Sequence, residues 1–319
     1  GNTYARMGRL STARDSYEEP AHLDGDLGDP NQQMDLLNSA ANLYVDMGRL
    51  GKANEAYGEA LEIALSEGNV QYEMAFRMNI ALNCVAEMRY PDAMRELDIV
   101  ASLLEEQNDP VYFTELLKNR GIVYLKTGEF ERARDDFLAF LEAAREIGDP
   151  VLETTAMVHI GYLYLELGAF DRGIAFADSA LAKAEKLESA AIRNEALSLA
   201  AQLEEARGNL PEALEYWRTS VAVNSEAGAE LWKIHAEIGV ATVTALSGES
   251  ESARRMFLDL LPRIREMGLD DYESNIWMGV AHSFEDTDPD SAKYYYERSL
   301  ALIERVGMET GSAEPVSYT

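Results

Sequence analysis

The stretch LLKNRGIVYLKTGEFERARDDFLAFLEAAREIGDP, residues 116–150, decides the fold of this chain. Its apolar side chains recur at helical spacing in two blocks: Leu116, Leu117, Val123 and Tyr124, then Phe130, Ala133, Phe137 and Leu141. Thr127, Gly128 and Glu129 lie between the blocks, and glycine readily takes the left-handed backbone that ends a helix. The stretch therefore predicts two helices joined by a tight turn.

Gly128 belongs to a series with a spacing of 40 residues along the whole chain. Its members are Gly8, Gly48, Gly128, Gly168, Gly208 and Gly248, and the series is broken only by Met88 and Asp288. Asp29-Pro30, Asp109-Pro110 and Asp149-Pro150 mark the other joints, because aspartate caps a helix and proline is tolerated at its first position. The series predicts antiparallel helices of about 17 residues, joined by turns of two or three residues.

We call a set of residues spaced 40 apart a column of this register. The columns explain why the helices would stack. The first small column contains Ala41, Ala81, Gly121, Gly161, Ala201, Ala241 and Ala281, and the second contains Ala13, Ala53, Ala93, Ala133, Gly173, Ala213 and Ala253. The bulky column contains Tyr17, Tyr57, Leu97, Phe137, Trp217 and Phe257, and is interrupted by Ala177. Small and bulky columns can interlock, which predicts one continuous core.

These columns resemble the tetratricopeptide repeat, which places a small residue and Tyr in a first helix and then Ala and an aromatic residue in a second. Gly121, Tyr124, Ala133 and Phe137 match that pattern, as do Ala41, Tyr44, Ala53 and Tyr57. The period of 40 is similar to the arrays of kinesin light chain, LGN-type scaffolds and bacterial proteins with a CHAT protease domain. The resemblance implies an all-α, right-handed superhelical solenoid of antiparallel helix pairs. Departures occur at Pro20, Cys84, Glu204 and Thr244.

The register predicts a single array over residues 1–306. It has a partial repeat at 1–29 and repeats at about 30–69, 70–109, 110–149, 150–189, 190–229, 230–269 and 270–306, with 307–319 as a linker or tail. Gly1 to Tyr4 align with Gly121 to Tyr124 in the middle of a helix. We therefore expect this chain to be a fragment of a larger protein.

The composition narrows the classes of partner. The net charge of −29, from 57 acidic and 28 basic residues, argues against nucleic acid and against anionic membrane surfaces. No stretch has the roughly 18 apolar residues of a membrane span. Cys84 is the single cysteine, so no intramolecular disulfide can form, and a reducing compartment, the cytoplasm, is expected.

No catalytic or cofactor-binding set is visible in the sequence, so we expect no enzyme activity, no cofactor and no metal in this segment. His159, His235 and His282 fall in three different repeats, which disfavours a shared metal ion. The run Asp24-Gly-Asp-Leu-Gly-Asp29 has alternating carboxylates but lacks the closing glutamate of an EF-hand. It is interpreted as the frayed end of a second helix and a turn.

The family resemblance places the first helix of each repeat on the inner, concave surface, where such arrays hold peptides. The candidate groove residues are Asn38, Asn42, Met78, Asn79, Leu82, Lys118, Asn119, Ile122, Val158, His159, Tyr162, Gln202 and Glu205. Apolar residues beyond the needs of the core favour an exposed groove, although Val85, Leu125 and Leu165 could be buried against neighbours. Amides at its flanks could hydrogen-bond a peptide backbone. Acidic Glu205, Glu285 and Asp286 could receive a basic segment.

The sequence thus favours a scaffold that binds a protein or peptide with apolar anchors and a basic segment. Two alternatives stay open. One is a sensor of a signalling peptide or small molecule that regulates an adjacent effector domain, as the CHAT resemblance implies. The other is a structural spacer or self-association module.

Overall fold

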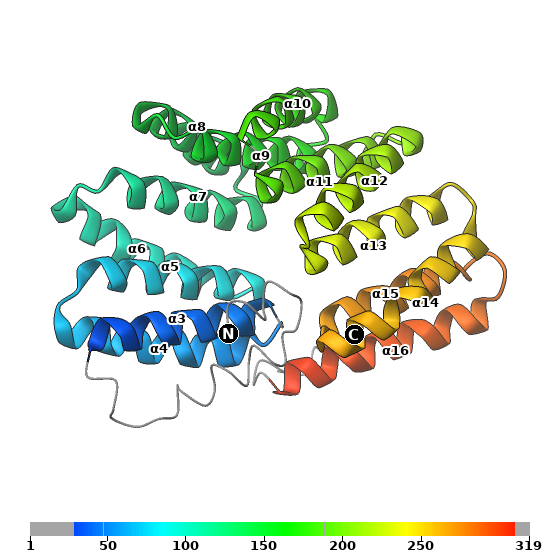
Figure 1. Ribbon diagram of the computed structural model, residues 1–319, viewed down its shortest axis with the longest axis horizontal. Helices are drawn as coiled ribbons and strands as arrows, with labels where there is room; N and C mark the ends of the chain where they lie inside the picture. Colours follow the sequence, from blue (N-terminus) through cyan, green and yellow to red (C-terminus); the bar gives the residue numbers. More distant parts are fainter. Residues whose placement is uncertain (1–28, 47, 188, 310–319) are drawn as a thin grey trace. The chain divides into compact units, whose positions relative to one another are not determined.

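The computed structural model describes residues 29–46, 48–187 and 189–309, and every secondary-structure element in these ranges is a helix (Figure 1). The helices are α3 (Pro30–Asp46), α4 (Leu50–Glu67), α5 (Val70–Ala86), α6 (Tyr90–Gln107), α7 (Pro110–Lys126), α8 (Phe130–Ile147), α9 (Pro150–Glu166), α10 (Phe170–Leu187), α11 (Ala190–Ala206), α12 (Leu210–Ala227), α13 (Glu230–Leu246), α14 (Ser250–Met267), α15 (Asp270–His282) and α16 (Pro289–Glu309). The expectations for the repeat at 1–29, including Gly8, Ala13, Tyr17, Pro20 and Asp24, and for 310–319 lie outside the described residues.

Helix lengths and turns follow the prediction. Helices α3 to α14 are 17 or 18 residues long, and Gly128 takes a left-handed φ of 77° at its turn. Where the glycine series breaks, Met88 adopts a left-handed φ of 59° instead. The side chains of Asp109 and Asp149 accept hydrogen bonds from the backbone N–H groups of the next helix, which stabilises its first turn.

The last repeat departs from the register. Helix α15 has 13 residues and ends at His282, and α16 begins at Pro289, which is 39 residues after the start of α14. Glu285 and Asp286, predicted on a first helix, therefore lie in the turns between α15 and α16. The prediction that these two residues line the inner surface of a helix is wrong, because the helix ends before it reaches them.

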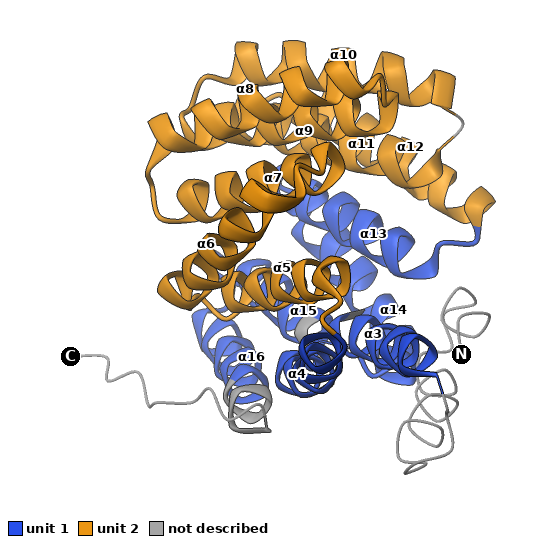
Figure 2. Ribbon diagram, turned by 90° about the vertical axis from the view of Figure 1, so that its left-hand side faces the viewer, with its two compact units in different colours: residues 1–67, 228–319 blue, residues 68–227 orange. Residues whose placement is uncertain are grey.

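Contacts divide the chain into two compact units (Figure 2). Unit 1 contains α3, α4 and α13 to α16, and unit 2 contains α5 to α12. In unit 2, α5 contacts α7, α7 contacts α9 and α9 contacts α11, and each of these four first helices also contacts its own second helix. Among the described helices of that unit, successive second helices have no comparable contacts. The first helices α5, α7, α9 and α11 therefore form one layer. We call the side of this layer that faces away from the second helices the inner face of unit 2.

Small residues allow the close packing that the columns predicted. A Cβ atom added to Gly121 would lie 2.5 Å from the ring of Phe137, and one added to Gly279 would lie 2.5 Å from the ring of Phe257. At Gly161 the neighbour is different: Leu199 of the following repeat fills the space, because Ala177 is too short to reach it. Described members of both small columns and of the bulky column through Phe257 are buried.

None of the helices that the structure describes combines the length and the apolarity needed to cross a bilayer.

Candidate functional site

A row of four side chains runs across the inner face of unit 2. Leu82, Ile122, Tyr162 and Gln202 occupy the same register position on α5, α7, α9 and α11, and all four are half-buried. Because consecutive first helices touch, residues 40 positions apart lie on neighbouring helices at the same height. We call this row the inner stripe. It changes from apolar on α5 and α7 to polar on α9 and α11.

Polar groups from three helices gather around the polar end of the stripe. The side chains of Tyr162 and Gln202 are hydrogen-bonded, and burial, together with the charge of Glu195, raises the pKa of Tyr162 to about 12. Burial also raises the pKa of Glu195, while the charge of Lys118 opposes this shift. Lys118, Tyr162, Glu195 and Gln202 form what we call the polar cluster. Its tyrosine keeps its proton at neutral pH and can donate a hydrogen bond.

Ser198 lies beneath this cluster. It is three residues after Glu195 and four before Gln202 on α11, so the three side chains share a helix face. The residue is only 5% exposed, and its hydroxyl has no hydrogen-bond partner among the described residues. A buried hydroxyl without a partner is unfavourable, so a ligand or water that reached it would relieve a desolvation penalty.

Lys118 contributes the positive charge of the cluster and forms an ion pair with Glu115, one turn earlier on α7. Its side chain retains partial exposure. Since Glu195 also feels this charge, the lysine connects α7 electrostatically with α11.

His159 contributes an uncharged imidazole ring. Its ring stacks on Phe137 of the preceding repeat, with ring centroids 5.4 Å apart and an interplanar angle of 17°. Burial, with a smaller effect from the Lys118 charge, lowers the pKa of His159 to about 3. The imidazole is therefore neutral near physiological pH and contributes packing and hydrogen bonding instead of charge.

The α11 end of the inner face is acidic. Burial raises the pKa of the half-buried Glu205, and the Trp217 side chain acts in the opposite sense. At the α5 end, Leu82 and Val85 are apolar and half-buried. The inner face thus has an apolar side at α5 and α7 and a hydrogen-bonding, acidic side at α11.

Not all predicted groove residues present their side chains at this surface. Met78, Asn119 and Val158 are 5%, 2% and 2% exposed, because the helices pack closely enough to cover them. They support the face from within instead of lining it. Asn79 remains half-buried, and Leu125 is buried as the alternative interpretation held.

Asn38 and Asn42 lie on α3 of unit 1, so they do not belong to the inner face of unit 2. Asn42 accepts a hydrogen bond from the hydroxyl of Tyr57 on α4, so it connects the two helices of its own repeat. That Asn38 and Asn42 contact a ligand remains a prediction.

Sequence reasoning missed Glu195 and Ser198. Ser198 occupies a column that already held a candidate, since it lies 80 residues after Lys118, whereas Glu195 lies 80 residues after Glu115, which was not a candidate. For Ser198 the column alone was a usable signal. What it lacked was the burial that distinguishes these two residues from solvent-exposed polar residues.

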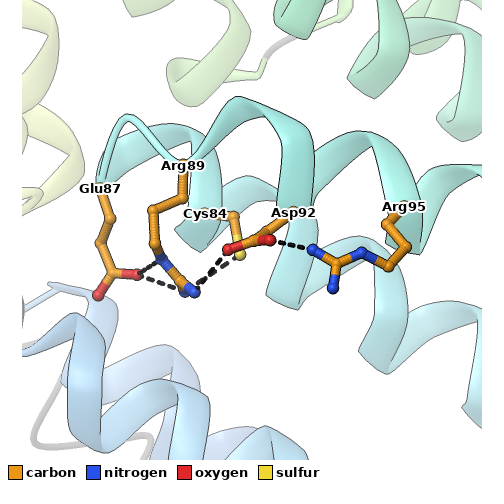
Figure 3. A network of polar contacts seen from close by, with 5 residues as sticks. All are labelled: Cys84, Glu87, Arg89, Asp92 and Arg95. Carbon is orange, nitrogen blue, oxygen red and sulfur yellow. Dashed lines mark hydrogen bonds and ion pairs between the residues drawn. The ribbon is translucent and has the colours of Figure 1, made fainter.

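Cys84, in the last turn of α5, belongs to a polar network with the turn between α5 and α6 (Figure 3). The Arg89 guanidinium donates hydrogen bonds to the Glu87 and Asp92 carboxylates and to the Cys84 Sγ, the last at 3.2 Å. Burial raises the pKa of the Cys84 thiol, which keeps it protonated and weakly nucleophilic. The network holds the turn at Met88 in place. Within the described residues, no three His, Cys, Asp or Glu side chains are grouped as metal ligands.

Comparison with known proteins identifies the repeat. A family model described as tetratricopeptide repeat matches residues 35–66, which cover most of α3 and α4. The same helix pair recurs through the described chain with small and bulky residues in the same columns. The fold is a tetratricopeptide-repeat array. A search of curated proteins found no match.

Solved structures share this fold. The Rap protein complexed with Competence and Sporulation Factor is 14% identical, with a TM-score of 0.64 and coverage of 97% of both chains. The Rap conjugation gene regulator of plasmid pLS20 in complex with the Phr* peptide is 13% identical, with a TM-score of 0.67 and coverage of 93% of this chain and 83% of that chain. A tetratricopeptide repeat protein from Parabacteroides merdae is 19% identical, with a TM-score of 0.52 and coverage of 88% and 99%. At these identities the similarity concerns the fold alone.

Proposed function

We propose that this tetratricopeptide-repeat array is a protein-interaction module that binds a peptide or partner segment along the inner face of unit 2. The observation that carries the proposal is the inner stripe. Leu82, Ile122, Tyr162 and Gln202 keep accessible surface on four adjacent helices, whereas the neighbouring core columns are buried. A partly accessible row on a preformed scaffold provides binding area without a large ordering penalty.

The chemistry of the face indicates the kind of ligand. Apolar side chains would pack on Leu82 and Ile122, and the peptide backbone would exchange hydrogen bonds with Tyr162, Gln202 and the amide of Asn79. A basic group would lie at the α11 end, near Glu195. Charge at that end would set orientation and association rate more than affinity.

A peptide sensor is the second candidate, and the solved structures favour it. Two of the Rap structures hold a factor or peptide, and the alignment with this chain covers 97% and 83% of their lengths. In that role, peptide binding would change the geometry of the array and thereby regulate an effector domain, such as the CHAT-like protease that the sequence resemblance implied. Small-angle scattering with and without a selected peptide tests it: a sensor changes its radius of gyration on binding, and a rigid scaffold does not.

The binding function itself is tested by selecting peptides from a random library displayed on phage, using the full chain as bait. Selected peptides are then titrated by fluorescence anisotropy against a variant carrying Leu82→Glu, Ile122→Glu and Tyr162→Glu. Buried acidic side chains in a hydrophobic contact should weaken binding by at least about tenfold.

The matched control carries three glutamates on exposed apolar positions of second helices: Leu65→Glu, Leu138→Glu and Leu258→Glu. It should bind the selected peptides as the natural chain does, and circular dichroism should show equal helicity for both variants. Equal loss in the two variants, or no loss in either, would remove the inner face as the binding surface and leave the spacer alternative.

A further inference from the structure

Helix α16, the last helix that the structure describes, carries an apolar strip on unit 1. Ala292, Tyr296, Leu300 and Ile303 are spaced by four, four and three residues, so they follow one side of the helix. Leu300 and Ile303 are 44% and 51% exposed. A shallow pocket of about 390 Å³ lies on this strip, with Ala292, Tyr296 and Leu300 in its lining. We call these four residues the α16 strip.

The equivalent residues of the preceding second helix are buried. Because α16 begins 39 residues after α14, the counterparts of the strip are Ala253, Phe257, Leu261 and Ile264. Leu261 is 6% exposed and Ile264 is fully buried, because α15 packs against α14 and places Gly279 on the Phe257 ring. The α16 strip thus has the composition of a helix-packing surface.

The same interface recurs inside both units. Helices α6, α8, α10 and α14 each contact the first helix of the next repeat, which is α7, α9, α11 and α15 respectively. The α16 strip continues this established interface by one step. A helix that covers it would have an apolar side with a small residue at the position of Gly279, opposite Tyr296.

Charge decides what kind of helix fits. Exposed Glu285 and Glu297 line the pocket on the strip, with exposed Lys293 as the cation among its lining residues. A second copy of this chain would bring another charge of −29 to the same place, which opposes self-association. A partner helix with lysine or arginine beside its apolar side is complementary.

We propose that the α16 strip is a docking site for a basic amphipathic helix of a partner protein, which packs there as the first helix of a further repeat would pack. The site is on unit 1 and does not depend on ligand binding at the inner face of unit 2. Binding through it would therefore persist in the triple glutamate variant of the inner stripe.

The probe for the test is a synthetic, fluorescently labelled peptide with the sequence of α15, residues 270–282, in which Asp270→Lys, Asp271→Lys and Asn275→Lys supply the basic border. It keeps the glycine that packs on an aromatic ring. The unmodified α15 peptide is the acidic comparison. Both are titrated against the full chain by fluorescence anisotropy at low and high salt.

Saturable binding of the basic peptide is expected, weakened at high salt and at least about fivefold weaker for the acidic peptide. The double variant Leu300→Glu, Ile303→Glu should lose at least about tenfold in affinity. The control Leu258→Glu, on the exposed side of α14, should bind unchanged. Both variants replace exposed side chains, so circular dichroism should show an intact fold.

Three outcomes would overturn the proposal. The first is absence of binding, or binding that the double variant retains. The second is sedimentation of the natural chain as a dimer that the double variant converts to a monomer, which would assign the strip to a second copy. The third is binding that appears only after removal of residues 310–319, which would assign the strip to the chain's own terminal segment.

Discussion

Leu199 provides the sharpest test of the packing in unit 2. In the repeats on α7–α8 and α13–α15, a glycine faces an aromatic ring of a second helix, but Gly161 faces Leu199 of the following repeat. Leu199 is fully buried. Leu199→Ala removes three carbon atoms, each worth about 0.8 kcal/mol of transfer free energy. With the cavity left behind, the free energy of unfolding should fall by about 3 kcal/mol.

A compensating substitution exists at residue 177. Ala177 is fully buried and occupies the column that holds Phe137 and Trp217 in other repeats. Ala177→Leu alone would overfill the space taken by Leu199 and cost about 1–3 kcal/mol. Combined with Leu199→Ala, the new leucine would occupy the cavity from the opposite side. The double variant should therefore be more stable than the sum of the two single effects predicts, by at least about 1 kcal/mol.

Urea unfolding followed by circular dichroism measures all four proteins of this cycle, with the m-value checked for each. Leu138→Ala, at an exposed position on α8, is the control and should change stability by less than about 0.5 kcal/mol. If Leu199→Ala costs less than about 1 kcal/mol, or if the two substitutions are additive, the side chain does not fill the space at Gly161 and the reasoning is refuted.

Three further predictions concern single residues. Met88 is 75% exposed at a left-handed φ of 59°, so Met88→Gly should raise the free energy of unfolding by about 1 kcal/mol. Asn108→Gly should raise it by less, because asparagine tolerates the left-handed backbone. An unchanged free energy of unfolding for Met88→Gly would contradict backbone strain at this residue. Hydrogen bonds from Arg265 hold the pKa of Glu273 below 4.5, so the stability that the ionised carboxylate contributes is present above pH 4.5 and is lost as pH falls through the folded pKa. In urea titrations at decreasing pH, the free energy of unfolding should therefore fall less steeply for Glu273→Gln than for the natural chain. The same pH dependence in both proteins would contradict this role of Glu273. The pKa of His159 is lowered from 6.5 to about 3, so its NMR signals should show no titration step near pH 6.5. Its contribution to stability should decline as pH falls from 6.5 towards 3, because the unfolded chain takes up a proton that the folded chain does not.

The inner face illustrates how far columns alone can lead. Leu82, Ile122, Tyr162 and Gln202 were candidates by register, and the structure places them in one row at partial exposure. Val158 was a candidate for the same reason, yet it is buried. A column fixes the direction of a side chain on its helix. Its exposure depends on how closely the next helix approaches, which differs from repeat to repeat.

The sequence by itself determined the helices, their lengths and most of their turns. These features depend on interactions within a few residues: glycine at Gly128 permits a left-handed turn, and Asp109 and Asp149 cap the helices that follow them. The 40-residue spacing repeats these local signals, and the same local structure recurs with them. Local chemistry was sufficient for this level of the fold.

Only the tertiary structure decided which side chains meet. It brought Lys118 and Glu195, from different repeats, into one polar cluster, and it placed Leu199 against Gly161, where the register of the Gly161 repeat expected residue 177. It also left Leu300 and Ile303 exposed on α16 although their counterparts on α14 are buried. Burial and charge interactions depend on the neighbours that surround a residue in space. Two positions with the same local pattern can therefore have different environments.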